Sequence, residues 1–176
     1  MSGPEARRCV VVMGVSGVGK TAVARRLAER LDLPWIDADD LHPVRNVAKM
    51  ARGTPLDDAD RQPWLEAVGA WLRERCSAGP GGVVACSALA RSHRDVLRRS
   101  VIGVVFVHLT AEPAVIAHRI SHRTGHFMPA SLLASQLAAL EPLGPGEVGA
   151  SVDAGLDLDE VVAAAVEVVK RADASP

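Results

Sequence analysis

The stretch Gly14-Val15-Ser16-Gly17-Val18-Gly19-Lys20-Thr21 decides the fold of this chain of 176 residues. It has the form G-x-x-x-x-G-K-T, it follows the apolar run of residues 9–13, and apolar residues then recur every four positions, as in a helix. A strand, a glycine-rich loop and a helix in this order form a phosphate-binding loop, in which backbone N–H groups and a helix N-terminus face phosphate oxygens. The sequence therefore predicts a site for a nucleoside triphosphate.

The residues of this loop have distinct predicted roles. Lys20 supplies a positive charge for the β- and γ-phosphates, and the hydroxyl of Thr21 supplies a ligand for Mg²⁺. The residues predicted to bind the nucleotide are Gly14, Val15, Ser16, Gly17, Val18, Gly19, Lys20 and Thr21.

Length and composition predict a single globular domain over residues 1–176. Hydrophobic residues make up 48% of the chain and the formal net charge is −1, so no basic surface for nucleic acid or an anionic membrane is expected. No apolar run approaches the roughly 18 residues of a membrane span, and we expect a cytoplasmic protein. Cys9, Cys76 and Cys86 form no C-x-x-C pair, so we expect them to be small buried hydrophobic residues in a reducing compartment.

Strand and helix patterns alternate along the whole chain. Apolar runs predict strands near residues 9–13, 34–36, 83–86, 101–109 and 148–152, with helices between them, including helices over residues 40–52 and 57–76. The strand segments are apolar on both faces, which is typical of a parallel sheet covered on both sides. The expected fold is therefore α/β, with three layers and about five parallel strands.

A phosphate loop does not by itself distinguish a kinase from a GTPase or a motor ATPase. The chain has no N-K-x-D motif and no D-x-x-G motif after the loop, and its third predicted strand ends at Ser87 rather than at an aspartate. These absences argue against a GTPase. The chain is short, and nearly all of it is expected to form one sheet with its helices, which favours a kinase for a small molecule.

Two carboxylates, Asp37 and Asp39, follow the second predicted strand, beside the loop. Ligands of open parallel sheets bind at the carboxyl ends of the strands. One carboxylate can hold a water molecule bound to Mg²⁺, and the other can accept the proton of an attacking hydroxyl group. The alternative is that Asp39 or Asp40 caps the next helix.

Three groups of basic residues are candidates for binding an anionic or hydroxyl-rich ligand. His42, Arg45 and Lys49 share one helical face by their spacing, although a solvated charged face would have the same pattern. Arg94 lies on a second basic face after Ser87. A hinge at Gly125, within a segment of about residues 120–135, predicts a mobile lid whose basic residues reach the phosphoryl group. These lid residues are Arg119, His122, Arg123 and His126.

Several motifs resemble those of the small phosphate-loop gluconate kinases. They are D-A-D-D-L-H-P at residues 37–43, G-T-P-L-D-D-A-D-R-Q-P-W-L at 53–65, C-S-A-L at 86–89, Arg94-Asp95, G-H-F at 125–127 and L-E-P at 140–142. The resemblance covers about residues 10–142. It implies ATP-dependent phosphorylation of D-gluconate at the 6-hydroxyl, Mg²⁺ as cofactor, a fold like that of nucleoside monophosphate kinases, and a homodimer.

The resemblance also implies roles for individual residues. Lys20, Asp39 and Arg123 would be catalytic, Arg119 would bind the nucleotide, and Mg²⁺ would meet Thr21 directly and Asp37 through water. The gluconate ligands would be Asp39, His42, Arg45, Lys49, Ser87, Arg94 and His126. Ala90 and His93 depart from the family, which usually has a basic and an aromatic residue there. A kinase for another acid, such as shikimate, and a regulatory protein that binds nucleotide without turnover are the alternatives.

Overall fold

Five parallel strands form the centre of the molecule, and the computed structural model describes residues 8–122 and 132–174 of the chain. The strands are β1 (Arg8–Met13), β2 (Trp35–Asp37), β3 (Gly81–Ala85), β4 (Val105–Thr110) and β5 (Gly149–Asp153). Their order in the sheet is β2-β3-β1-β4-β5, and each neighbouring pair is parallel. All five carboxyl ends therefore meet at one edge of the sheet, where ligands of this fold class bind.

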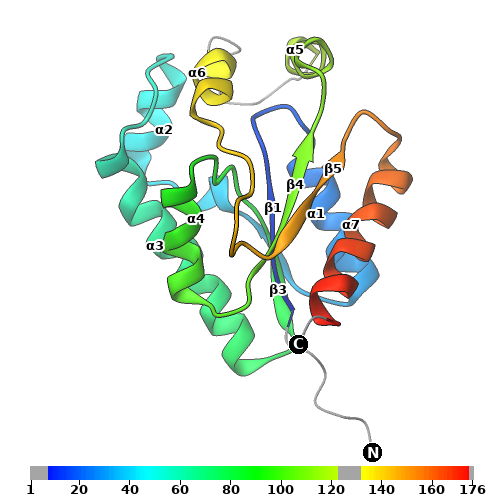
Figure 1. The fold of residues 1–176 in the computed structure, drawn as a ribbon. Helices are drawn as coiled ribbons and strands as arrows, with labels where there is room; N and C mark the ends of the chain where they lie inside the picture. Colours follow the sequence, from blue (N-terminus) through cyan, green and yellow to red (C-terminus); the bar gives the residue numbers. More distant parts are fainter. Residues whose placement is uncertain (1–7, 123–131, 175–176) are drawn as a thin grey trace, which may run out of the picture.

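Helices cover both faces of this sheet (Figure 1). The helices α1 (Lys20–Leu31) and α7 (Leu158–Asp173) lie on one face, and α3 (Asp58–Ala78) and α4 (Arg91–Ser100) lie on the other. Three more helices, α2 (Val44–Ala51), α5 (Pro113–Ser121) and α6 (Leu132–Ala139), gather at the carboxyl ends of the strands. This arrangement confirms the predicted three-layer α/β fold.

The apolar pattern of β1 shows why two layers of helices are needed. Val10 and Val12 belong to the core on the side of α1 and α7, whereas Val11 and Met13 belong to the core on the side of α3 and α4. All four side chains are fully buried. A strand covered on both sides has no polar face, which explains the unbroken run of apolar residues.

Two details of the predicted elements are wrong. The helix expected over residues 40–52 is divided into the 3₁₀ turn η1 (Ala38–Leu41) and α2, which begins after Pro43. Proline has no N–H to donate and disfavours a helical residue before it, so His42 is extended. The second strand is also not a direct neighbour of the first, because β3 lies between them.

All three cysteines are buried, as predicted, but two of them are paired, which the sequence did not predict. Cys9 of β1 and Cys76 of α3 form a disulfide in the core, with their Cα atoms 6.3 Å apart. They are 67 residues apart in the sequence, and only the packing of α3 on the sheet brings them together. Cys86 is free and buried, as predicted, and burial raises the pKa of its thiol to about 12.

Arg94 forms a buried ion pair and does not face the ligand-binding edge. Its Nε donates to Glu147 Oε1 over 2.5 Å, and neither side chain is exposed to solvent. The guanidinium also donates to the carbonyl oxygens of Ala88, Leu89 and Pro142. Arg94 therefore ties the loop after β3 to the segment that leads into β5, and it is not among the described residues that line the pocket where a substrate contact was expected.

Removing one member of this pair should cost much stability. Glu147→Gln would leave the Arg94 charge buried without its counter-ion, so we expect the free energy of unfolding to fall by about 3–5 kcal/mol. The partly exposed pair Arg98–Asp95, with an N–O distance of 2.8 Å and about a third of each side chain in contact with solvent, provides the control. Asp95→Asn should cost about 1 kcal/mol or less. Urea denaturation measures both changes, and equal losses in the two variants would contradict a structural role for the buried pair.

Candidate active site

The phosphate loop connects β1 to α1 at the ligand-binding edge of the sheet. Gly17 has a φ of +82°, and a Cβ atom at this position would lie 2.5 Å from Ile120 Cγ1 of α5. A Cβ at Gly14, where φ is +143°, would lie 2.7 Å from the carbonyl oxygen of Leu109. Glycine is therefore required at both positions, for its backbone freedom and for the close packing of β4 and α5 against the loop.

Two donors of the loop, the Ser16 N–H and Lys20 Nζ, are bound by groups of the protein itself. Lys20 Nζ donates to the Val15 carbonyl oxygen over 3.0 Å, and the Ser16 N–H donates to Gln136 Oε1 of α6 over 2.6 Å. An amide oxygen on a loop N–H occupies the kind of position that a phosphate oxygen takes in such loops. The loop is therefore formed, with its donors directed at acceptors.

Thr21 and Asp37 join the loop to the end of β2. Thr21 Oγ1 donates to Asp37 Oδ2 over 2.5 Å. A hydroxyl and a carboxylate side by side are suitable donors for Mg²⁺, which takes few protein ligands beside phosphate oxygens and water. No group of three or more His, Cys, Asp or Glu residues that could hold a metal occurs within residues 8–122 and 132–174. The pair thus fits Mg²⁺ shared with phosphates, and a metal held by protein alone is not indicated in these ranges.

The 3₁₀ turn after β2 places Asp39 in the same pocket. Asp37 caps this turn, because its Oδ1 accepts from the Asp39 N–H over 3.0 Å. The helix α2 begins at Val44 without a side-chain cap among the described residues. Neither Asp39 nor Asp40 therefore caps α2, and the Asp39 carboxylate lines the pocket while Asp40 is exposed.

His42 is buried and neutral beside these carboxylates. Its ring stacks on Trp64 of α3, with 4.1 Å between ring centroids. Burial, together with the charge of Arg61, lowers the pKa of His42 to about 4, against the opposing effect of Asp37. Asn46 Nδ2 donates toward Nδ1 at 3.4 Å, which leaves the proton on Nε2, 3.9 Å from Asp39 Oδ1. His42 is thus an uncharged neighbour of Asp39, at a distance longer than a hydrogen bond.

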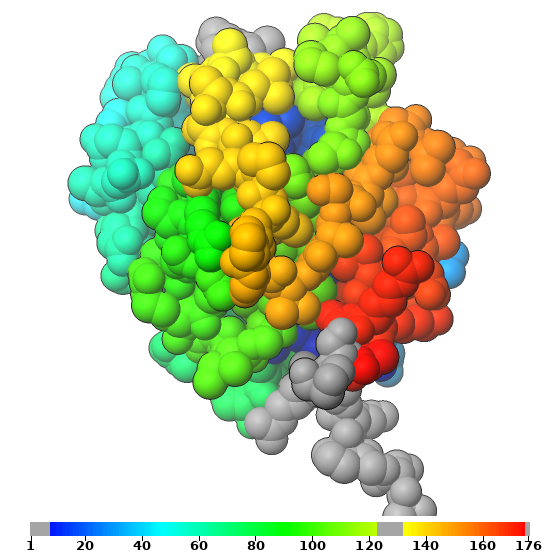
Figure 2. Space-filling model, viewed as in Figure 1, coloured from blue at the N-terminus to red at the C-terminus, as the bar shows by residue number. Residues whose placement is uncertain are grey.

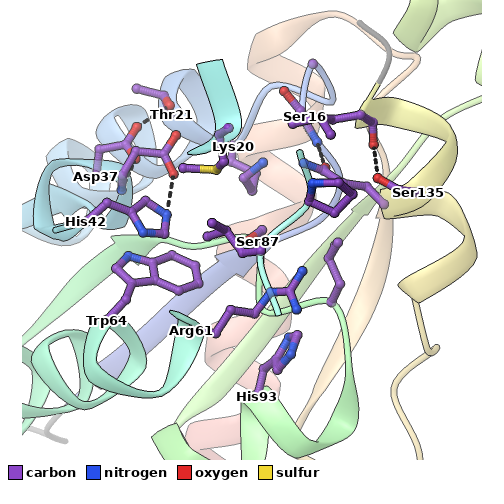
Figure 3. A pocket seen from close by; sticks show the side chains of 18 of the residues that line it. Ser16, Lys20, Thr21, Asp37, His42, Arg61, Trp64, Ser87, His93 and Ser135 are labelled. Carbon is purple, nitrogen blue, oxygen red and sulfur yellow. Dashed lines mark hydrogen bonds and ion pairs between the residues drawn. The ribbon is translucent and has the colours of Figure 1, made fainter. Parts of the chain in front are cut away.

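One pocket at this edge collects residues from many helices and loops (Figure 3). The polar lining comes from the phosphate loop, the end of β2, the loop after β3 and the helices α3, α4 and α6, and Met50, Leu56 and Leu132 form a small apolar cluster at its wall. The polar residues are Ser16, Lys20, Thr21, Asp37, Asp39, His42, Arg61, Ser87, His93, Ser135 and Gln136. The space-filling view shows α6 lying over this region, between α2 and α5 (Figure 2).

The structure brings some of the predicted site residues together in the pocket and places others outside it. Those that line the pocket are Ser16, Gly17, Gly19, Lys20, Thr21, Asp37, Asp39, His42 and Ser87. Arg45, which is exposed, and Lys49, which pairs with Asp60 and Asp57, are not among its described lining residues. Arg119 donates to the carbonyl oxygens of Val18 and Ala154, so it supports the loop from outside. Arg123 and His126 lie outside the described residues.

Sequence reasoning missed five polar or aromatic residues of the pocket: Arg61, Trp64, His93, Ser135 and Gln136. Arg61 and Trp64 stand in the family-like segment of residues 53–65 and are three positions apart on α3, which places them on one helical face. That spacing was the available signal. Gln136 has no such signal, because its place depends on how α6 packs on the loop.

No helix in the described parts of the chain has the length and apolar character needed to cross a membrane.

Comparisons with known proteins agree with this geometry. A family model described as an AAA domain matches residues 9–143. A gluconokinase of Gluconobacter oxydans (strain 621H) is 54% identical over 140 residues, which are 80% of this chain and 79% of the relative. The thermoresistant gluconokinase of Escherichia coli (strain K12) is 40% identical over 162 residues, which are 92% of this chain and 93% of the relative.

Solved structures show the same similarity. An unliganded sugar kinase from Janibacter sp. HTCC2649 superposes with a TM-score of 0.89 at 46% identity, covering 95% of this chain and 96% of that one. A gluconokinase from Sinorhizobium meliloti 1021 superposes with a TM-score of 0.83 at 48% identity, covering 94% of this chain and 93% of that one. A shikimate kinase from Aquifex aeolicus vf5 superposes with a TM-score of 0.60 at 14% identity, covering 95% of this chain and 99% of that one. This similarity shows a shared fold alone.

The low pKa of His42 predicts a pH dependence of stability. The unfolded chain takes up a proton at this residue near pH 6.5, and the folded protein does so only near pH 4. The contribution of neutral His42 to the free energy of unfolding is therefore complete above pH 6.5 and is lost as the pH falls toward 4. The loss should be roughly 3 kcal/mol. His42→Gln should therefore show a shallower fall in the free energy of unfolding between pH 7 and 4 than the parent, measured by urea denaturation. Identical slopes would mean that His42 is not held neutral.

Proposed function

The chain belongs to the gluconokinase family of phosphate-loop kinases, and from this premise we propose that it transfers the γ-phosphoryl group of ATP to the 6-hydroxyl of D-gluconate. The products are 6-phospho-D-gluconate and ADP. The observation that carries the proposal is that one pocket contains both the phosphate loop and the carboxylate of Asp39. A phosphoryl donor and a base for the acceptor hydroxyl can thus meet in one space.

At the donor end, the loop N–H groups and Lys20 hold the β- and γ-phosphates. Phosphate oxygens would replace Gln136 Oε1 at the Ser16 N–H and the Val15 carbonyl oxygen at Lys20 Nζ. Both exchanges put a fully charged acceptor in place of a neutral one, which strengthens the hydrogen bonds. Lys20 is catalytic because the charge that it faces is spread over the γ-phosphoryl oxygens in the transition state.

The magnesium ion would be held at Thr21 and Asp37. Thr21 Oγ1 would be a direct ligand, and Asp37 would accept from a water molecule of the ion. The existing hydrogen bond between the two side chains keeps both oxygens at the same place beside the loop. When bound, Mg²⁺ supplies charge neutralisation for the β- and γ-phosphate oxygens.

At the acceptor end, Asp39 receives the proton of the 6-hydroxyl. The freed oxygen forms a bond to the γ-phosphorus, the bond from this phosphorus to the β–γ bridging oxygen breaks, and ADP leaves with the electron pair. His42 lies beside the Asp39 carboxylate as an uncharged neighbour, with Nε2 3.9 Å from Oδ1, and the Ser87 hydroxyl would bind a hydroxyl group of the sugar acid. The neutral state of His42 suits this proton transfer to Asp39, because a cation here would make Asp39 a weaker base.

The lid, the role of Arg119 and the homodimer are proposals supported by the family resemblance. Arg123 and His126 would enter the site with a closing lid, and Arg119 supports the loop near the nucleotide. The homodimer likewise stays a prediction.

Asp39→Asn tests the assignment of the base. The amide cannot accept the proton, so kcat with gluconate should fall about 100- to 10,000-fold while the KM for ATP stays nearly unchanged. Asp40→Asn is the matched control, because the neighbouring carboxylate is exposed and does not line the pocket; its kcat should stay within about twofold of the parent. A coupled ADP-release assay measures both. Normal turnover in Asp39→Asn would remove this residue from catalysis.

A further inference from the structure

The pocket has charges of opposite sign at its two ends. Asp37 lies near Lys20 at the phosphate loop, whereas Arg61 and His93 lie at the other end, with Ser87 between them (Figure 3). Asp39, whose N–H donates to Asp37 Oδ1, belongs to the first end. A substrate that carries one carboxylate is repelled by the first end and attracted by the second. This inference rests on the proposed function, and it concerns how the acid is oriented and selected.

Arg61 is the cation available at the second end. Apart from Lys20, it is the only Lys or Arg among the described residues that line the pocket. Its side chain is 23% exposed, and the partner recorded for it in the described ranges is Asp58, at 3.7 Å. That distance is longer than a hydrogen bond, and the Asp58 carboxyl is 92% exposed, so water weakens its hold on the guanidinium.

His93 offers a second donor beside Arg61. Its Nδ1 accepts from the Ala90 N–H over 3.2 Å, at the start of α4, so in the neutral ring the proton is on Nε2. Burial and the neighbouring Arg61 lower the pKa of His93, against the effect of Asp58, whose Oδ1 lies 3.8 Å from Nε2. The imidazole is thus a neutral donor with a fixed orientation.

The other charged groups near this end lie on its outer side. Asp58, Asp95 and Arg99 line a groove between α3 and α4 that shares only Arg61 and His93 with the pocket, as far as the described residues show. Asp95 is paired with Arg98 at 2.8 Å. Arg61 and His93 therefore form the wall between this outer groove and the substrate pocket.

We infer that Arg61 and His93 bind the carboxylate of the sugar acid and determine that the site selects acids over neutral polyols. Arg61 supplies the charge, and His93 Nε2–H supplies a second hydrogen bond. With the carboxylate anchored there, the far end of the six-carbon chain points toward Asp39 and the phosphate loop.

The test compares D-gluconate with D-gluconamide, in which a neutral amide replaces the carboxylate. Arg61→Met should raise the KM for gluconate about 10- to 100-fold, with the KM for ATP unchanged, because a charge-assisted hydrogen bond is lost. His93→Phe, which has an aromatic ring without a donor, should raise the KM for gluconate about threefold to tenfold. Turnover or inhibition by gluconamide should change less than threefold in both variants.

Arg99→Met is the matched control, because it removes the same charge from the outer groove without altering the pocket. Its KM for gluconate should stay within about twofold of the parent. Thermal unfolding establishes that each variant is folded, and Arg61→Lys, which keeps the charge but not the forked donors, should lie between the parent and Arg61→Met.

Two outcomes overturn the inference. One is an unchanged KM for gluconate in folded Arg61→Met, and the other is an equal loss with gluconate and gluconamide. If neither the parent nor any variant binds gluconamide, the two KM values of Arg61→Met decide the test. A raised KM for gluconate with an unchanged KM for ATP supports the inference, and an equal rise in both contradicts it. A parent protein that does not phosphorylate gluconate would refute the proposed function itself. An active parent whose KM for gluconate is unchanged by Arg61→Met would refute only the carboxylate site.

Discussion

The hydrogen bond from Thr21 Oγ1 to Asp37 Oδ2 joins the two halves of the proposed site. β1 and β2 are separated by β3, so the phosphate loop and the acidic turn do not meet through the sheet. They meet because α1 begins at the loop and carries Thr21 to the end of β2. The donor and acceptor ends of the pocket therefore have a fixed relation before any ligand binds, which is how a kinase lowers the entropic cost of aligning two substrates.

The sequence predicted what is local and missed what depends on packing. The phosphate loop and the acidic turn are each contiguous, so their residue types and spacing were sufficient to predict the fold class and to identify residues that line the pocket. Strand order, the Cys9–Cys76 pair and the place of Gln136 each depend on contacts between distant segments. Arg94 was assigned to the substrate because a basic helical face looks the same whether it meets a ligand or a buried carboxylate. Its partner Glu147 lies 53 residues away.

Two consecutive residues of α4, His93 and Arg94, have different partners although they belong to the same local sequence pattern. His93 faces the pocket, whereas Arg94 faces the buried carboxylate of Glu147 and holds the carbonyl oxygens of Ala88 and Leu89. Ala88 has a φ of +39°, which is unusual for a residue other than glycine, and it stands between two residues that line the pocket. The ion pair thus supports the loop that carries Ser87. Stability and specificity are supplied by neighbouring side chains with different partners.

The central claim is that the pocket transfers phosphate from ATP to the 6-oxygen of an acid. The most direct measurement is an ADP-release assay with fixed ATP and Mg²⁺ over a panel of sugar acids and shikimate, followed by NMR of the product. The account predicts the highest kcat/KM with D-gluconate and phosphorus coupled to the hydrogens on C6. Phosphate on another oxygen, or turnover of shikimate with none of gluconate, would contradict it.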